Sequence, residues 1–322
     1  MVWCFLVIEG IQNLEVRKLS TVLLFIDGVG LGEEKSYNPW FIYPTPHINQ
    51  LLRGKSLVRQ ATGDYGDEVT LLQTDACLGI AGIPQSATGQ ATIFTGRNAP
   101  MAMGKHMSGL PFKRLREWVE KDNIYLQFEH KGWRATFANS YTKEYFERPV
   151  TKRGWISVST AAICSSQEPI RLLPDLIAGK AVYHDLTRKT LKRWIPEIEE
   201  ITPEQAAMDL WGIAYEVDLV IHEFFLSDLA GHKQQKELIE WVIKTYDRFL
   251  GELVRLKRKE DLIVLTSDHG NSEDLRVKTH TMNSVPTLII GKEKGIKKKD
   301  QKKWDLTHIA PLLHRMVQQQ KA

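Results

Sequence analysis

The chain has 322 residues, of which 43% are hydrophobic and 25% are charged. This is the composition of an ordinary globular protein and excludes a disordered or fibrous chain. With 43 Lys and Arg against 39 Asp and Glu, the net charge is +4, too small to indicate a dedicated nucleic-acid binder. We expect the densest basic run, Lys297 to Lys299 with Lys302 and Lys303, to be a solvated loop, because no aromatic residues are interleaved with it.

The three cysteines, Cys4, Cys77 and Cys164, include no CxxC pair, so we expect neither a disulfide framework nor a thiolate zinc site. A reducing cytoplasm is the expected compartment. The first residues are apolar but lack the basic region and cleavage site of a signal peptide. Since no run reaches the roughly 20 apolar residues that span a bilayer, we expect a soluble protein, with residues 1–19 forming an extra strand or an extension.

Strands and helices alternate along much of the chain. A helix is predicted over 112–121. A second helix is predicted to begin at the capping sequence Thr202-Pro203-Glu204-Gln205. A third is predicted over 236–259, where apolar residues recur every three or four positions. Short apolar, β-branched runs predict buried strands at 21–26, 219–226, 262–266 and 285–290. This alternation is typical of an α/β fold with a mostly parallel sheet.

The middle of the chain has a different pattern, with shorter apolar runs such as 133–138 and 155–164. We therefore predict a catalytic α/β core built from residues 20–104 and 202–322. Residues 105–201 are predicted to form a smaller inserted α+β cap across the strand ends, where a substrate could be held.

Acidic residues follow three of the predicted strands: Asp27 in LLFIDGVG, Asp228 in FFLSDLAGH and Asp268 in IVLTSDHGN. The ligand site of an open α/β sheet lies beyond the carboxyl ends of its strands, so these residues can converge although they are far apart in sequence. A single Asp after a strand is usually a turn residue or a helix cap. Their convergence is the prediction to test.

Three histidines accompany these carboxylates. His232 follows Asp228 by four positions across a predicted glycine turn, His269 adjoins Asp268, and His280 lies between two threonines. Mixed oxygen and nitrogen ligands suit zinc or manganese, and six of them would serve two metal ions about 3.5 to 4 Å apart. The alternative is that these histidines are ordinary core or surface residues.

The segment PQSATGQAT, residues 84–92, is predicted to open a helix. A hydroxyl at such a position lies near free backbone N–H groups and is suited to receiving a phosphoryl group. Taken alone, a serine at this position is more often a simple N-cap. If metal ions bind nearby, its oxygen could instead become a nucleophile.

Taken together, these motifs resemble the alkaline phosphatase superfamily, and most closely its cofactor-independent phosphoglycerate mutase and phosphopentomutase branch, with a short cap. The resemblance rests on five ordered motifs: Asp27-Gly28-Val29-Gly30, Ser86-x-x-Gly89, Asp228-x-x-Gly231-His232, Asp268-His269-Gly270-Asn271 and Thr279-His280-Thr281. It implies a three-layer α/β core. It also implies that Ser86 is the phosphorylated nucleophile. One metal ion would be held by Asp27, Ser86, Asp268 and His269, and the other by Asp228, His232 and His280.

The chain also departs from this family pattern. Gln90 stands where the mutases have His after the glycine of the nucleophile turn, and Gln cannot transfer a proton. The arginines of the mutase cap cannot be placed. Arg97, Lys105 and His106 follow the nucleophile helix and could contact a phosphate, although isolated cations are more often surface residues.

We therefore expect an enzyme that needs two Mn²⁺ or Zn²⁺ ions and transfers a phosphoryl group from a small phosphomonoester, as a phosphomutase or a phosphatase. A phosphodiesterase with Thr88 as nucleophile is an alternative, as is a noncatalytic metal-binding protein with the same fold. A sulfatase is not expected, because Cys77 lacks the Cys-x-Pro-x-Arg context of that family. No nucleic-acid or membrane partner is expected.

Overall fold

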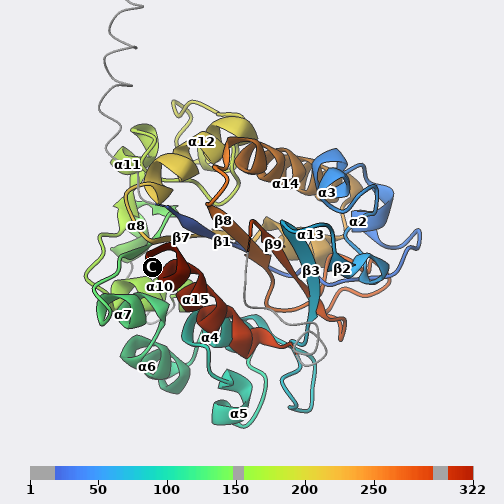
Figure 1. The fold of residues 1–322 in the computed structure, drawn as a ribbon, viewed down its shortest axis with the longest axis horizontal. Coiled ribbons are helices and arrows are strands. Elements are labelled where there is room, and N and C mark those ends of the chain that lie inside the picture. The colour runs from blue at the N-terminus through green and yellow to red at the C-terminus, as the bar shows by residue number, and fades with distance from the viewer. Residues whose placement is uncertain (1–18, 148–155, 293–303, 322) are drawn as a thin grey trace, which may run out of the picture.

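A computed structural model describes residues 19–147, 156–292 and 304–321 (Figure 1). The basic run at 297–303 and the first 18 residues, for which we made predictions, lie outside the described residues. A seven-stranded sheet in the order β2-β3-β9-β8-β1-β7-β4 organises the fold. Its strands are β1 (Thr21–Ile26), β2 (Gly63–Asp64), β3 (Val69–Thr74), β4 (Ala135–Phe137), β7 (Leu219–Phe224), β8 (Leu262–Thr266) and β9 (Val285–Ile290). A separate two-stranded sheet pairs β5 (Ser140–Tyr141) with β6 (Arg171–Leu172).

The centre of the large sheet is parallel. Strand β1 pairs in parallel with β7 on one side and β8 on the other, and β4 extends this parallel block beyond β7. Strands β9, β3 and β2 add antiparallel pairs at the opposite edge. The carboxyl ends of β1, β7, β8 and β4 therefore meet at one edge, where a ligand site is expected.

Helices cover both faces of the sheet, which gives three layers (Figure 1). Alternate residues of β1 point to opposite layers: Val22 and Leu24 lie in one buried core, and Leu23 and Phe25 in the other. The first core is covered by α2 (Pro39–Ile42), α3 (Pro46–Leu51), α12 (Pro203–Ala214), α13 (Leu226–Lys233) and α14 (Lys236–Leu256). The second is covered by α4 (Ser86–Thr95), α5 (Ala99–Met103), α6 (Lys113–Lys121), α7 (Ile124–Glu129), α10 (Val158–Cys164) and α15 (Ile309–Lys321).

The predicted α/β fold with a mostly parallel sheet is confirmed. Strands β1, β8 and β9 have the predicted bounds, whereas β7 ends at Phe224, two residues early. The predicted cap at the start of α12 is present, since the Thr202 side chain accepts a hydrogen bond from the backbone N–H of Gln205. Strands β2 and β3 were not predicted.

The middle segment contacts the core more closely than an overlying cap would. Strand β4 joins the edge of the large sheet beside β7, and α6, α7 and α10 pack their apolar residues into the second core. In the described part of this segment, α8 (Lys143–Phe146), α11 (Leu173–Ile177), the 3-10 helix η2 (Leu191–Arg193) and the small β5–β6 sheet lie outside these layers, and Leu176 and Leu191 pack in a small cluster of their own. The division into a core and an inserted cap at 105–201 stays a prediction. Within the described ranges, no helix has the length and apolarity needed to cross a membrane.

Candidate metal centre

The three predicted carboxylates converge at the carboxyl edge of the parallel strands. Asp27 directly follows β1, and Asp268 lies two residues beyond β8. Asp228 lies on α13, which begins just after β7, so it follows the end of its strand by four residues. Parallel strands bring these segments together although Asp27 lies more than 200 positions before the other two carboxylates in the sequence.

The first group of possible ligands is Asp27, Asp268 and His269, whose ligand atoms all lie within 4.8 Å of one another. The Nε2 atom of His269 lies 3.3 Å from Asp27 Oδ1 and 3.5 Å from Asp268 Oδ2. Ser86 Oγ joins this group, at 2.8 Å from the same Nε2 atom. These four residues are the ones that the family resemblance assigns to one metal ion.

The second group is Asp228, His269 and His280, again with ligand atoms within 4.8 Å. The His280 Nε2 atom lies 3.7 Å from Asp228 Oδ1, and His232 Nε2 lies 3.3 Å from Asp228 Oδ2. Asp228 and His232 share one face of α13 because they are four residues apart on a helix. The predicted glycine turn between them was therefore wrong.

The electrostatics of the centre favour a bound cation. Burial, and then repulsion between the two carboxylates, raise the pKa of Asp27 well above its usual value, and burial raises that of Asp268. The oxygens Asp27 Oδ1 and Asp268 Oδ2 are buried without a hydrogen-bond donor. Unpartnered buried oxygens are costly, and divalent cations of the kind held by carboxylate and imidazole ligands would satisfy them. The residues present therefore fit such ions.

The three histidines present their Nε2 atoms to the centre, and their Nδ1 atoms lie near backbone oxygens. His232 Nδ1 is 2.6 Å from the Lys278 carbonyl oxygen, and His280 Nδ1 is 3.0 Å from that of Pro84. Burial lowers the pKa of both His269 and His280, which favours neutral rings. A neutral ring that donates from Nδ1 leaves Nε2 free to bind a metal ion.

Two glycines allow the segments of the centre to approach closely. A Cβ atom on Gly89 of α4 would lie 2.8 Å from the backbone oxygen of Asp268. Gly28 has a φ of +68° and a side chain there would meet Asp228 at 2.6 Å. Both positions therefore need glycine, since a side chain would separate the carboxylates from their neighbours.

The hydroxyls of Ser86 and Thr88 face different surroundings. Ser86 is the first residue of α4, and Gln85 is the cap, so Ser86 is not an N-cap. Thr88 is fully buried, and its hydroxyl donates to the Gln85 carbonyl at 3.3 Å and accepts from the Met107 N–H at 3.1 Å. The Ser86 hydroxyl, unlike that of Thr88, contacts His269 of the first group of ligands.

Gln90 and the three predicted phosphate contacts lie around α4. The Gln90 side-chain amide donates to Asp27 Oδ2 at 3.4 Å, so it holds that carboxylate. The Arg97 guanidinium pairs with Asp122 at 3.3 Å and lies over the Trp118 ring, so it is engaged by neighbouring helices. His106 Nε2 lies 3.3 Å from the Ile80 carbonyl. A phosphate contact by Arg97, Lys105 or His106 stays a prediction.

Two residues that support the centre were given no role by the sequence analysis: Asn271 appeared only as part of a motif, and Glu273 was not singled out. Asn271 donates to Asp228 Oδ1 at 2.5 Å and thereby orients that carboxylate. The fully buried Glu273 accepts from the backbone N–H of Gly30 at 2.9 Å and of Asn271 at 2.8 Å. It also accepts from Thr281, so it ties together the loops that carry Asp27, Asp268 and His280. The polar run that follows Asp268 in the sequence was the available signal.

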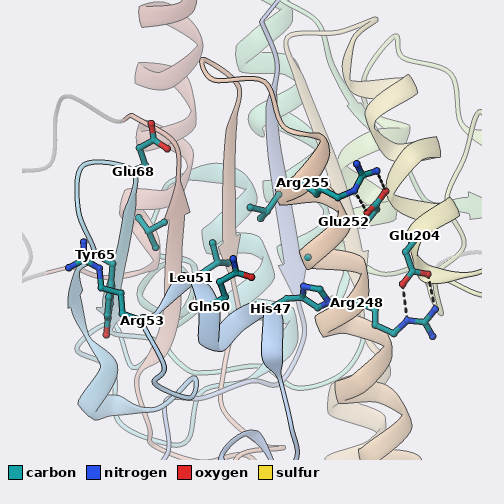
Figure 2. Close-up of a pocket in the computed structure, with 13 residues that line it drawn as sticks. His47, Gln50, Leu51, Arg53, Tyr65, Glu68, Glu204, Arg248, Glu252 and Arg255 are labelled. Carbon is teal, nitrogen blue, oxygen red and sulfur yellow. Dashed lines mark hydrogen bonds and ion pairs between the residues drawn. The ribbon is translucent and has the colours of Figure 1, made fainter.

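A separate cavity of about 640 Å³ lies between α3, β3 and α14 (Figure 2). Two of the arginines that line it, Arg248 and Arg255, pair with Glu204 and Glu252, respectively. Residues of the candidate metal centre do not line it. The cavity in Figure 2 is therefore a distinct surface feature.

The C-terminal part of the chain matches a known family. Residues 203–320, which include Asp228, His232, Asp268, His269 and His280, match the profile described as "Metalloenzyme superfamily". The predicted resemblance is confirmed over this segment. The match agrees with the cluster of carboxylates and imidazoles at this edge of the sheet.

Among curated proteins, the 2,3-bisphosphoglycerate-independent phosphoglycerate mutase of Wolinella succinogenes is 31% identical over 99 residues, which is 29% of this chain and 20% of the relative. A phosphopentomutase of Vibrio cholerae is 29% identical over 118 residues, 36% of this chain and 28% of the relative. The matched segments thus span less than a third of either relative.

Among solved structures, the PH0037 protein from Pyrococcus horikoshii gives a TM-score of 0.53 at 14% identity and covers 94% of this chain and 98% of its own. This likeness concerns the fold alone. It agrees with the three-layer α/β arrangement described above.

Proposed function

We propose that this protein is a two-metal-dependent enzyme that transfers a phosphoryl group from a small phosphomonoester through a phosphoserine at Ser86. The observation that carries the proposal is the position of Ser86 Oγ, 2.8 Å from His269 Nε2 and beside a pair of buried carboxylates. A hydroxyl among groups suited to divalent cations is the arrangement that an activated nucleophile requires.

One ion would be held by Asp27, Ser86, Asp268 and His269. The other would be held by Asp228, His232 and His280. Either Mn²⁺ or Zn²⁺ suits this mixture of carboxylate and imidazole ligands. When bound, the two ions would supply the positive charge that activates the serine hydroxyl and offsets the charge of the transferring phosphoryl group.

Groups of the protein itself would supply the nucleophile and hold the phosphoryl group and the metal ligands in place. The Ser86 oxygen would lose its proton and attack phosphorus opposite the substrate oxygen. The bond from phosphorus to that oxygen would break, and the leaving oxygen would take up a proton and depart as the alcohol. The N–H groups in the first turn of α4 have no helical acceptors and would face the phosphoryl oxygens. Asn271 and Gln90 keep the Asp228 and Asp27 carboxylates in place through their side-chain amides.

The second half of the reaction decides between two activities. Water as acceptor of the phosphoryl group gives a phosphatase, and a second hydroxyl of the same substrate gives a phosphomutase. Gln90 supplies no proton at the position where the mutases have His, so acid–base catalysis there is absent from either activity. The proposed compartment is the cytoplasm, where phosphorylated metabolites are available.

A phosphodiesterase with Thr88 as nucleophile has weaker support. The Thr88 hydroxyl is buried and already bonded on both sides, to Gln85 and Met107. A noncatalytic metal-binding protein would not need Ser86 beside the carboxylates. We therefore favour phosphomonoester chemistry at Ser86.

The proposal is tested by metal content and turnover measured together. Elemental analysis of protein loaded with Mn²⁺ or Zn²⁺ should find two ions per chain, and an aryl phosphate monoester should be hydrolysed faster than the matching diester. Ser86→Ala should abolish turnover, whereas Ser165→Ala, outside the centre, should leave it unchanged. Two bound ions without turnover of either ester or of a panel of sugar phosphates and phosphoglycerates would favour the noncatalytic alternative.

A further inference from the structure

A second cavity, of about 430 Å³, lies where the middle segment meets the end of β7. Its wall includes Tyr141 and Tyr145 from the middle segment, Ser159 and Thr160 from α10, and Glu223 from β7. The backbone of Glu223 is fixed by Asn139, whose side chain accepts from the Glu223 N–H at 2.9 Å and donates to its carbonyl at 2.7 Å. The cavity is therefore a formed part of the fold.

No ligand of the candidate metal centre lines this cavity, but Glu223 in its wall stands on the strand next to the one that leads to Asp27. Glu223 pairs with Phe25 across the parallel strands β7 and β1, and Asp27 follows Phe25 by two residues. Phe25 and Ile221 lie in the same buried core, on one face of the sheet. Asp27 and Glu223 each follow one of them by two residues, and residues two apart on a strand share a face, so both carboxylates lie toward that face.

The lining of the cavity is rich in hydroxyl groups and poor in positive charge. Ser159 donates to the Glu223 carboxylate, and the Thr160 hydroxyl lies 3.0 Å from that of Tyr141. Burial lowers the pKa of His184, also in the lining, to about 4, so its ring is neutral. Among the described residues that line the cavity there is neither lysine nor arginine.

We infer that this cavity binds the alcohol portion of the substrate, and that this portion is an uncharged polyol whose hydroxyls are recognised by Glu223 and the surrounding hydroxyl groups. The inference rests on the proposed phosphoryl transfer at Ser86 and names the substrate class. A buried carboxylate accepts hydrogen bonds from alcohols. It repels a second anionic group, which the cavity's described lining offers no cation to neutralise.

Glycerol 3-phosphate and 3-phosphoglycerate form a matched pair of probes for this inference. Both carry one phosphate on a three-carbon skeleton, and they differ in having a hydroxymethyl group or a carboxylate at the far end. Burial raises the pKa of Glu223 to about 7, so measurements at pH 8 keep its carboxylate mostly charged. A difference in affinity then reports the charge that the cavity accepts.

The experiment is calorimetric titration of the metal-loaded Ser86→Ala protein, which cannot form the phosphoserine, with each probe. Glycerol 3-phosphate should bind at least about tenfold more tightly than 3-phosphoglycerate. Glu223→Gln, which keeps the shape and the acceptor for Ser159, should reduce this ratio to about threefold or less by removing the repulsion. Glu240→Gln on α14, which removes the same charge away from the cavity, should leave the ratio unchanged.

The inference is overturned if 3-phosphoglycerate binds as tightly as glycerol 3-phosphate, or if Glu223→Gln does not alter the ratio. It is also overturned if neither probe binds to protein whose wild-type form hydrolyses an aryl phosphate. If the protein shows the expected preference for glycerol 3-phosphate but turns over no phosphate ester, the proposed function is contradicted and the inferred binding site is supported. Absence of both binding and turnover would contradict both.

Discussion

Ser86 Oγ lies 2.8 Å from His269 Nε2, although 183 positions separate the two residues in the chain. This contact brings the first turn of α4 to the end of β8, where Asp268 and His269 follow the strand. It joins a hydroxyl to a pair of buried carboxylates in one small volume. The proposed nucleophile and the proposed metal ligands are thus parts of one arrangement.

His280→Ala and His232→Ala should reduce metal content by about one ion per chain and leave the ion held by Asp27 and Asp268 in place. The reason is that both imidazoles contact Asp228, which is absent from the first group of ligands. Elemental analysis after dialysis checks this expectation. His130→Ala, which changes a histidine outside the centre, is the control. Loss of both ions from His232→Ala would contradict the division of ligands.

Gly89→Ala should destabilise the protein and weaken metal binding, because its Cβ would lie 2.8 Å from the Asp268 backbone oxygen. We expect a cost of about 1 to 3 kcal/mol in the free energy of unfolding, typical of overpacking in a core. The matched control is Gly212→Ala on α12, where nothing lies within 4 Å of the added atom. That change should be neutral or stabilise by up to about 1 kcal/mol. Urea unfolding measures both, and equal effects would contradict the close approach.

Glu273→Ala should unfold at a lower urea concentration than the wild type even without metal. Removing the carboxylate leaves the buried N–H groups of Gly30 and Asn271 without acceptors, at a cost of about 1 to 3 kcal/mol for each group. Glu237→Ala, at the exposed start of α14, should cost less than about 0.5 kcal/mol. A metal-free Glu273→Ala protein as stable as the wild type would show that Glu273 does not hold these loops.

The central strands, the helices α12 and α14 and the convergence of the three carboxylates could be predicted from the sequence. Buried parallel strands are continuous apolar runs, and their carboxyl ends meet at one edge, so Asp27 and Asp268 were predictable site residues. Strand β4 was harder, because three residues carry no periodicity that indicates which sheet they join. Its pairing with β7 depends on contacts far along the chain.

The supporting residues of the centre could not be predicted in the same way. Glu273 and Asn271 lie in an irregular loop, where their roles depend on which backbone N–H groups and carboxylates the fold brings near them. Glu223 stands at the end of an apolar strand, and the sequence alone does not indicate that a cavity opens beside it. The helix that carries Asp228 and His232 was not predicted, because Gly231 in the sequence favours a turn. In the structure Gly231 is part of the helix, and a Cβ atom there would lie 2.5 Å from Asn271 Oδ1.

The most direct test of the account is mass spectrometry of metal-loaded enzyme quenched with acid during turnover of a phosphomonoester. We predict one added phosphate on the peptide that contains residues 84–97, localised by fragmentation to Ser86 and absent from the Ser86→Ala protein. The burial of Thr88 and its bonds to Gln85 and Met107 predict no phosphate there. A phosphate trapped on Thr88, or turnover that persists in Ser86→Ala, would contradict the assignment of Ser86 as the nucleophile.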